Sequence, residues 1–590
     1  MMQKVYFQVK VHDAPAHLFD VTMNLSKVEK GQLFRLPEWI PGSYMIRDFA
    51  RHIVSIQALS VDKLLNLEKI DNCTWRLNEN AEHLTLNYQV YAWDLSVRSA
   101  HLDQVHAFFN GTSLFLEPVD YPVTEYHLDI PKPEQSFAKN WVLATSMSRV
   151  SGKQDFSFGK FVAKDYDDLI DHPVEMGELE IESFEVAGKK HSVAVTGDHF
   201  GDLKRLVADL KSVCDYQVRL FGELPEAVTH YVFLLHVLPN GYGGLEHRSS
   251  TALQCSENEL IKLNDPINDD YLNLLTLCSH EYFHTWNVKQ IKPDVFLPYD
   301  LNTETFTKQL WIFEGFTSYF EDRTLYDCGV ISETHYLKLL SQVITRVYRG
   351  SGRKLQSVAE SSFDAWTRFY KQGENAPNAI VSYYAKGKLI GLCLDILIRD
   401  RTNNQQSLHE VIQQMWTEYG KPQKGMREGD LEKLIEEKIG VNLIDEIRQF
   451  VYTTEELPVE SLLAKSGVTL KWNNPVSLKE LTTEVSADVS LGATVKSNSA
   501  GAELVVVYHN SNAHNLGLSN GDVVIAINNR QVDVGTIEKS FARFNVGDLA
   551  KVHYFRRGRL YESSSEVIRS EKSTCQLTRS EHPPKIKWLN

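Results

Sequence analysis

The chain has 590 residues, of which 62 are basic and 77 acidic, giving a formal net charge of −15. This length exceeds what one hydrophobic core supports, and the negative charge disfavours binding to a phosphate backbone, so we expect three or more domains and no nucleic-acid partner. Seven scattered cysteines without a C-x-x-C pair, no signal segment and no run of about 20 apolar residues together predict a cytoplasmic protein with reduced thiols and no membrane partner.

The first part of the chain has the alternating pattern that is typical of β-strands. Apolar and polar residues alternate over residues 5–11, and the same period returns over residues 84–90. Few helical patterns interrupt this texture. We therefore predict a β-rich N-terminal domain over residues 1–185.

A mixed α/β region follows and passes into a mainly helical lobe. Leucines and a valine recur at helical spacing from Leu203 to Leu210, before an apolar run from Tyr231 to Val237 that is typical of a buried strand. Helical patterns then dominate from Tyr271 to about Tyr452. These patterns predict a second domain over residues 186–470. Short apolar runs between Asn, Ser and Gly turns return near residue 485, which predicts a small β domain over residues 485–570. The fold class is multidomain α+β.

The segment His280-Glu281-Tyr282-Phe283-His284 follows an apolar stretch that suits a buried helix. Residues four apart share a helix face, so both imidazoles can reach one ion while Glu281 projects toward a water bound to it. Zinc takes nitrogen and carboxylate ligands, and a catalytic site keeps one position open. A chance match on an amphipathic helix is the alternative.

A second helical segment supplies the ligand that this motif lacks. Its Glu314 lies 30 residues beyond His284, and a carboxylate on a neighbouring helix completes a two-His, one-Glu site. We therefore predict that His280, His284 and Glu314 bind one Zn²⁺ per chain, because the sequence has a single such constellation. Glu281 is predicted to be the general base.

These motifs resemble known families of peptidases. H-E-x-x-H followed by W-x-x-E-G-F is similar to the gluzincin metallopeptidases, which include aminopeptidase N. More closely, the segments Leu36 to His52, Tyr166 to Gly177 and His280 to Pro293 resemble the glycyl aminopeptidase family, peptidase family M61. That resemblance spans nearly the whole chain. It implies a β-rich N-terminal domain, a thermolysin-like catalytic domain, a C-terminal PDZ domain and a zinc-dependent aminopeptidase that prefers Gly or Ala.

The glycine-rich segment Gly241 to His247 acquires a role through this resemblance. It is similar to the G-x-M-E-N motif of aminopeptidase N-like enzymes, which lies along the substrate backbone. The likeness implies that Gly243 and Gly244 contact the substrate and that Glu246 binds its free α-amine. His247 stands where that motif has Asn, and an ordinary turn after a strand is the alternative for the glycines.

Tyr383-Tyr384-Ala385-Lys386-Gly387 resembles the Y-E-K-G segment of the same enzymes. The likeness implies that Tyr384 stabilises the oxyanion of the tetrahedral intermediate, together with the metal. Packing by two half-buried tyrosines is the alternative.

Residues between Leu491 and Asn528 resemble a PDZ domain of the bacterial protease-associated type. Such domains add an extended peptide as a strand and capture its terminal carboxylate, which predicts a C-terminal peptide as a ligand. Asn512 and Asn529 replace the usual Pro and Gly, and packing on the catalytic domain is the alternative role.

The sequence thus predicts a hydrolase that cleaves the first peptide bond of peptides with a free N-terminus. A thermolysin-like endopeptidase is one alternative, and Glu246 argues against it. A non-catalytic PDZ scaffold is another, and the intact set of His280, Glu281, His284 and Glu314 argues against that.

Overall fold

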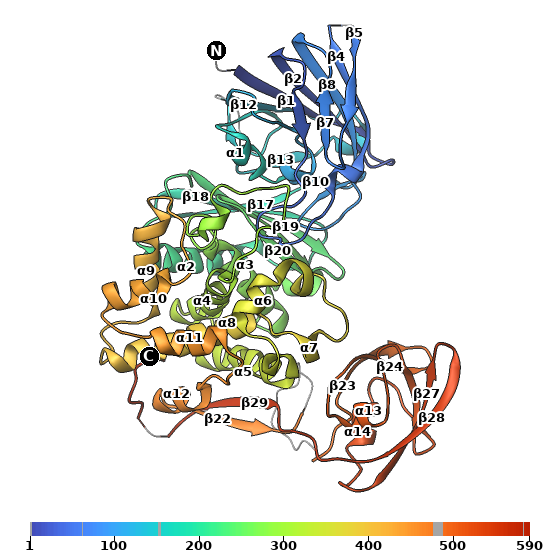
Figure 1. Cartoon of the computed structure of the whole chain (residues 1–590), viewed down its shortest axis with the longest axis vertical. Coiled ribbons are helices and arrows are strands. Elements are labelled where there is room, and N and C mark those ends of the chain that lie inside the picture. The colour runs from blue at the N-terminus through green and yellow to red at the C-terminus, as the bar shows by residue number, and fades with distance from the viewer. Residues whose placement is uncertain (1–2, 62, 151–154, 476–487, 582, 590) are drawn as a thin grey trace. The chain divides into compact units, whose positions relative to one another are not determined.

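The structure is a computed structural model that describes residues 3–61, 63–150, 155–475, 488–581 and 583–589 (Figure 1). The chain forms two compact units. The first comprises Met1–Thr305, Asp327–Val330 and Trp416–Met426, and the second comprises Phe306–Tyr326, Ile331–Met415 and Arg427–Asn590. Residues 485–487, with which the predicted PDZ-like domain begins, lie outside the described residues.

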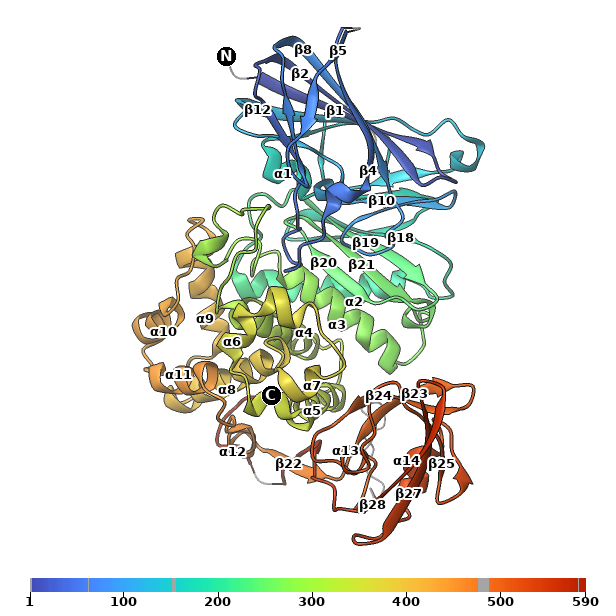
Figure 2. The same cartoon turned by 45° about the vertical axis from the view of Figure 1, so that its right-hand side comes forward.

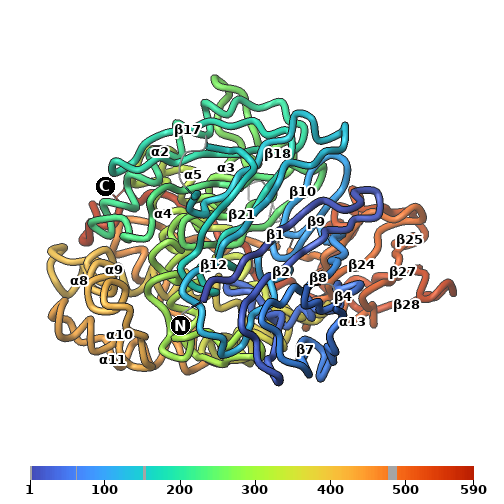
Figure 3. The backbone as a smooth tube through the Cα atoms, turned by 90° about the horizontal axis from the view of Figure 1, so that it is seen from above, coloured from blue at the N-terminus to red at the C-terminus, as the bar shows by residue number. Residues whose placement is uncertain are grey.

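The first unit begins with an eight-stranded sheet, whose strands β1, β2, β8 and β4 lie side by side in Figure 3. In spatial order the strands are β14 (Ser148–Arg149), β15 (Gly159–Ala163), β12 (Val123–Ile130), β1 (Gln3–Asp13), β2 (Leu18–Val28), β8 (Ala81–Tyr91), β4 (Ile53–Ser60) and β5 (Lys63–Leu65). The predicted alternation is present in β1, where Val5, Phe7 and Val9 are buried between more exposed neighbours. A β-rich N-terminal region is therefore confirmed.

Two four-stranded sheets complete this region. One has the order β13 (Val142–Ala144), β16 (Val174–Gly177), β10 (His106–Phe109) and β9 (Ala100–Leu102), and the other has the order β11 (Glu117–Pro118), β3 (Leu33–Arg35), β7 (Thr74–Leu77) and β6 (Leu67–Lys69). A short helix, α1 (Tyr166–Ile170), begins after Asp165, whose side chain accepts a hydrogen bond from the Asp168 amide.

A five-stranded sheet follows, with two long helices packed beside it (Figure 2). The sheet has the order β17 (Glu180–Val186), β18 (Lys189–Thr196), β19 (His230–Leu238), β21 (Ser250–Ser256) and β20 (Gly243–Glu246), and the helices are α2 (Leu203–Phe221) and α3 (Asp269–Phe283). The apolar run Tyr231 to Val237 lies in β19, as predicted. β20 pairs antiparallel with β21 and lies at the edge of the sheet.

The second unit contains the predicted helical lobe. Its main helices are η6 (Trp311–Gly315), α4 (Phe316–Asp327), α5 (Glu333–Arg349), α6 (Val358–Phe363), α7 (Ala376–Ala379), α8 (Ala385–Arg401), α9 (Leu408–Met415), α10 (Asp430–Leu434), α11 (Ile444–Tyr452) and α12 (Val459–Lys465). α8 is buried along most of its length. Two antiparallel strands, β22 (Val468–Asn473) and β29 (Thr574–Arg579), follow the lobe in the fold.

A β sheet with its own hydrophobic core lies between β22 and β29 in the chain. It contains β23 (Ala493–Asn498), β24 (Gly501–Val507), β25 (Val523–Ile527), β26 (Arg530–Gln531), β27 (Leu549–Arg556) and β28 (Arg559–Glu566), with the helices α13 (Asn512–Asn515) and α14 (Ile537–Phe541). The Asn512 side chain donates to the carbonyl oxygens of Ser490 and Ile568, so this asparagine has a structural role. The order of a β-rich region, a helical middle and a C-terminal β sheet confirms the predicted fold class.

The exact domain boundaries and the PDZ assignment stay predictions. Within the second unit, the Asn378 side chain donates to the Val507 carbonyl oxygen at 2.8 Å and accepts from the His509 amide at 3.0 Å. The C-terminal sheet therefore packs on the helical lobe through this asparagine. Among the described residues, we find no helix whose length and apolar character would let it cross a membrane.

Candidate active site

Helix α3 places the two histidines of the H-E-x-x-H motif on one face. Their Nε2 atoms lie 3.0 Å apart, and the rings meet edge to face. The Nδ1 atom of His284 lies 2.7 Å from the carbonyl oxygen of Asn287, and because a carbonyl only accepts, Nδ1 carries the proton of the neutral ring. The unprotonated Nε2 of His284 therefore faces His280. Backbone carbonyls hold metal-binding imidazoles in this tautomer.

Strand β20 lies directly against Glu281 of this helix. A Cβ atom added to Gly244 would be 2.1 Å from Oε1 of Glu281, so only glycine allows this approach. A Cβ atom on Gly243 would instead meet nothing closer than 3.9 Å. Glu246, Glu281 and His284 each offer a ligand atom, and these atoms all lie within 4.8 Å of one another. The structure thus brings Gly244, Glu246, Glu281 and His284 together.

The carboxylate of Glu246 is held against a glycine from a distant part of the chain. Gly42 has a positive φ of 93°, and a Cβ atom there would lie 2.4 Å from Oε2 of Glu246. Glu246 itself is only 4% exposed. Gly42 belongs to the segment Leu36 to His52, so this segment shapes the pocket around the carboxylate.

A buried ion pair network anchors the residue after Glu246. Asp171 accepts hydrogen bonds from the Arg248 amide at 3.0 Å, and its carboxylate lies 2.8 Å from Nζ of Lys289 and 3.3 Å from Nδ1 of His247. Burial alone would raise the pKa of Asp171, but Lys289 and Arg248 outweigh burial and hold that pKa well below its usual range. Through Asp171, which directly follows α1, His247 is linked to Lys289 in the segment after α3, and the sequence left this role of His247 open.

The second unit holds Glu314 and Tyr384. Glu314 lies in η6 and is 2% exposed. The next residue, Gly315, touches α8, since a Cβ atom on it would lie 2.6 Å from Cα of Gly387. This backbone contact positions η6 beside the start of α8, where the hydroxyl of Tyr384 lies 3.2 Å from that of Tyr370.

The two adjacent tyrosines differ in burial. Tyr383 is fully buried, and burial raises its pKa well above the usual range. Tyr384 is half-buried and stacks on Tyr383 with ring centroids 4.7 Å apart. Of the two, Tyr384 is the phenol with an accessible surface. That Glu314 and Tyr384 act in one site with the residues of the first unit stays a prediction.

Comparison with known proteins gives the following likenesses. A family model described as the peptidase M61 N-terminal domain matches residues 6–178, and one described as M61 glycyl aminopeptidase matches residues 273–390. A crystal structure of an aminopeptidase N family protein from Idiomarina loihiensis has 42% sequence identity and a TM-score of 0.96, over 99% of this chain and 99% of that chain. A crystal structure of an M1 zinc metallopeptidase from Deinococcus radiodurans has 11% identity and a TM-score of 0.47, over 78% of this chain and 95% of that chain. No curated protein matches the sequence.

Proposed function

The chain belongs to the M61 glycyl aminopeptidase family and is a peptidase, and from this premise we propose that it is a zinc-dependent aminopeptidase. Its substrates are peptides with a free N-terminus, cleaved at the first peptide bond. The glycyl preference in the family's description supports a preference for small N-terminal residues such as Gly or Ala.

His280, His284 and Glu314 are the proposed ligands of one zinc ion in this site. Two imidazole nitrogens and one carboxylate are a donor set that suits Zn²⁺ and leaves a position open. The facing Nε2 atoms of His280 and His284, 3.0 Å apart, support this assignment. When bound, the ion lowers the pKa of a water and polarises the scissile carbonyl.

Glu281 is the proposed general base. Its carboxylate accepts a proton from the attacking water and returns that proton to the leaving amine, so no covalent intermediate with a protein nucleophile is needed. Tyr384 donates a hydrogen bond to the developing oxyanion. The edge strand β20 can take the substrate backbone as an added strand, and its glycine at position 244 allows a close approach.

One observation carries the choice of aminopeptidase over endopeptidase. The ligand atoms of Glu246 and Glu281 lie within 4.8 Å of each other. The α-amine of a substrate is two bonds from its first carbonyl carbon, so a carboxylate that binds the amine must lie beside the base. Glu246 meets this requirement, and an ion pair with the ammonium group would anchor the free N-terminus. An endopeptidase would instead need this space for further substrate residues.

The test compares substrates with free and with acetylated N-termini in wild type, Glu246→Ala and Glu246→Gln. Both variants should raise KM for free substrates more than for acetylated ones, because only free substrates lose an ion pair. Breaking a buried pair from one side costs on the order of 3–5 kcal/mol, and less in a cleft open to water. The Gln variant keeps the shape of the side chain, so it isolates the charge. Equal effects on both substrates would favour the endopeptidase.

The C-terminal sheet is proposed to be a PDZ-like domain. A C-terminal peptide added as a strand is its proposed ligand. The hydrogen bonds of Asn378 to Val507 and His509 support packing on the helical lobe as its second role.

A further inference from the structure

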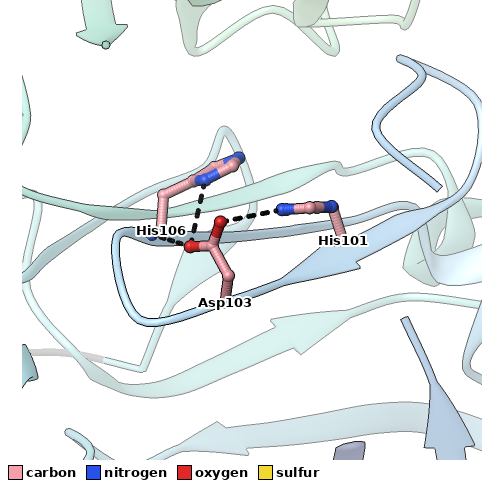
Figure 4. Close-up of side chains that lie close together, drawn as sticks. All are labelled: His101, Asp103 and His106. Atoms are coloured by element: carbon pink, nitrogen blue, oxygen red, sulfur yellow. Dashed lines mark hydrogen bonds and ion pairs between the residues drawn. The ribbon is translucent and has the colours of Figure 1, made fainter. Parts of the chain in front are cut away.

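A second group of metal-ligand side chains lies in the N-terminal region and contains none of the residues assigned to peptide hydrolysis. His101 in β9 and His106 at the start of β10 flank Asp103 in the turn between these strands (Figure 4). In Figure 4 one nitrogen of each imidazole faces the Asp103 carboxylate. The ligand atoms of the three residues all lie within 4.8 Å of one another.

The strand register places these histidines on one face of their sheet. Phe108 pairs with His101 on one side and with Glu175 of β16 on the other. Directly paired residues share a face, and so do residues two apart in a strand. His106 therefore lies on the same face as His101 and Glu175.

The ring nitrogens lie at distances from the Asp103 carboxylate that a metal ion can bridge. Nε2 of His101 lies 3.3 Å from Oδ2 of Asp103, and Nδ1 of His106 lies 3.7 Å from Oδ1. A hydrogen bond between charged partners measures about 2.7–2.9 Å. Ligands about 2.0–2.1 Å from a tetrahedral ion stand roughly 3.3–3.4 Å apart, which matches the 3.3 Å of the His101 pair, whereas the 3.7 Å of the His106 pair is longer.

The carboxylate is held in place by the backbone. Oδ1 of Asp103 accepts hydrogen bonds from the Val105 amide at 2.6 Å and from the His106 amide at 2.9 Å. Both imidazoles are buried, with His101 at 4% and His106 at 3% exposure. The three side chains are thus fixed before any ligand binds, and such preorganisation favours metal binding.

A cavity adjoins the cluster and contains polar atoms that lack partners. It has a volume of about 10 Å³, which is room for about one water-sized sphere. It lies between the sheet of β9 and β10 and the sheet of β19 and β21, and is lined by His101, His106, Glu175 and His236. Among the described residues, Oε1 of Glu175 and Nε2 of His106 have no hydrogen-bond partner. Glu175 is 3% exposed, and a buried carboxylate oxygen without a partner is costly. The exposed side chain of Leu95 belongs to the same lining, so the cavity offers an entry path.

We propose that His101, Asp103 and His106 form a second divalent-metal site, with the carboxylate of Glu175 close by in the adjoining cavity. Imidazole nitrogens select Zn²⁺, Co²⁺ or Ni²⁺ over Ca²⁺ and Mg²⁺, which prefer oxygen ligands. Because the ligands come from both strands of a hairpin and from its turn, the ion links the two strands and stabilises the folded state by mass action. This site does not depend on the proposed peptidase mechanism.

The test counts metal ions bound to the full-length chain. Protein stripped with a chelator is titrated with Co²⁺ or Zn²⁺, and the bound metal is measured by elemental analysis after gel filtration. Wild type should bind about two ions, and His106→Ala and His280→Ala about one each, because each variant removes one site. The matched control is His12→Ala, which breaks an exposed His–Asp pair, His12 to Asp20 at 2.8 Å, and should keep both ions.

Asp103→Asn separates metal binding from a purely structural role. The amide oxygen can still accept from the turn amides, so the melting temperature in chelator should match that of wild type. The loss of charge should weaken the second site about tenfold or more. A wild type that never binds more than one ion, lost in His280→Ala, would overturn the proposal. So would unchanged binding in Asp103→Asn and His106→Ala. One ion lost only in His106→Ala would support this site and refute the zinc site of the peptidase.

Discussion

A methyl group added at Gly244 tests the closest contact in the candidate active site. The added Cβ atom would lie 2.1 Å from Oε1 of Glu281 and 2.5 Å from its Cδ. To reach ordinary van der Waals contact at about 3.4 Å, the carboxylate and the strand must separate by about 1.3 Å. A misplacement of about 1 Å can cost on the order of 100-fold in rate. We therefore expect Gly244→Ala to lower kcat/KM about 100-fold, or about 2.7 kcal/mol in the barrier.

Gly243→Ala is the matched control, because a Cβ atom at this neighbouring position would lie 3.9 Å from its nearest contact, Nη1 of Arg98. Its loss of kcat/KM should be much smaller. Hydrolysis of a chromogenic aminoacyl amide measures both variants, and thermal unfolding with elemental analysis checks that fold and metal content are intact. Equal losses in the two variants, or a wild-type rate in Gly244→Ala, would refute the idea that β20 positions Glu281.

Three further changes probe the proposed roles. Glu281→Gln should keep the metal and lose nearly all turnover, because an amide cannot accept the proton. Turnover and metal content are measured on one sample, and a wild-type kcat would contradict the assignment. Tyr384→Phe should lower kcat and kcat/KM together, whereas Tyr383→Phe should mainly change the unfolding temperature. A rise in KM alone for Tyr384→Phe would instead indicate that its hydroxyl binds the substrate in the ground state. Asp171→Asn should lower the free energy of unfolding by about 3–5 kcal/mol at neutral pH, because it leaves buried cations without their partner. Lys289 holds the pKa of Asp171 well below its usual range in spite of burial, so this difference should shrink as the pH falls from about 4 toward the lowered pKa. Chemical unfolding at several pH values measures it, and a pH-independent difference would argue against the ion pair.

The helix that carries the H-E-x-x-H motif could be predicted from the sequence because the spacing of the two histidines matches the period of a helix. Residues four apart share a face on a helix and lie about 6 Å from each other, whereas in a strand they would lie about 13 Å apart, and α3 spans Asp269–Phe283 as the apolar pattern indicates. Its start is also local, since the Asn268 side chain caps the Tyr271 amide. The strand β19 could be predicted for a similar reason, from a continuous apolar run.

The surroundings of Glu246 could not be predicted from such local patterns. Gly42 meets the carboxylate, and Asp171 ties down the following residue His247, but both come from distant parts of the chain. Neither the helical nor the strand period of the sequence predicts these contacts, because they join residues far apart in the chain. The family resemblance singled out their segments, and only the fold shows that Gly42 presses on the carboxylate while Asp171 neutralises Lys289.

The cluster in the β9–β10 hairpin could not be predicted from helical spacing, because its residues lie in two strands and the turn between them. His106 lies five positions after His101, an odd offset, so in one continuous strand the two side chains would face opposite sides. The turn at Asp103 reverses the chain, and the pairing of His101 with Phe108 then brings both imidazoles to one face. Helical motifs alone predict one ion per chain, whereas the hairpin register predicts two. The metal content of His280→Ala separates these expectations, since an ion retained there must occupy a site that no helix provides.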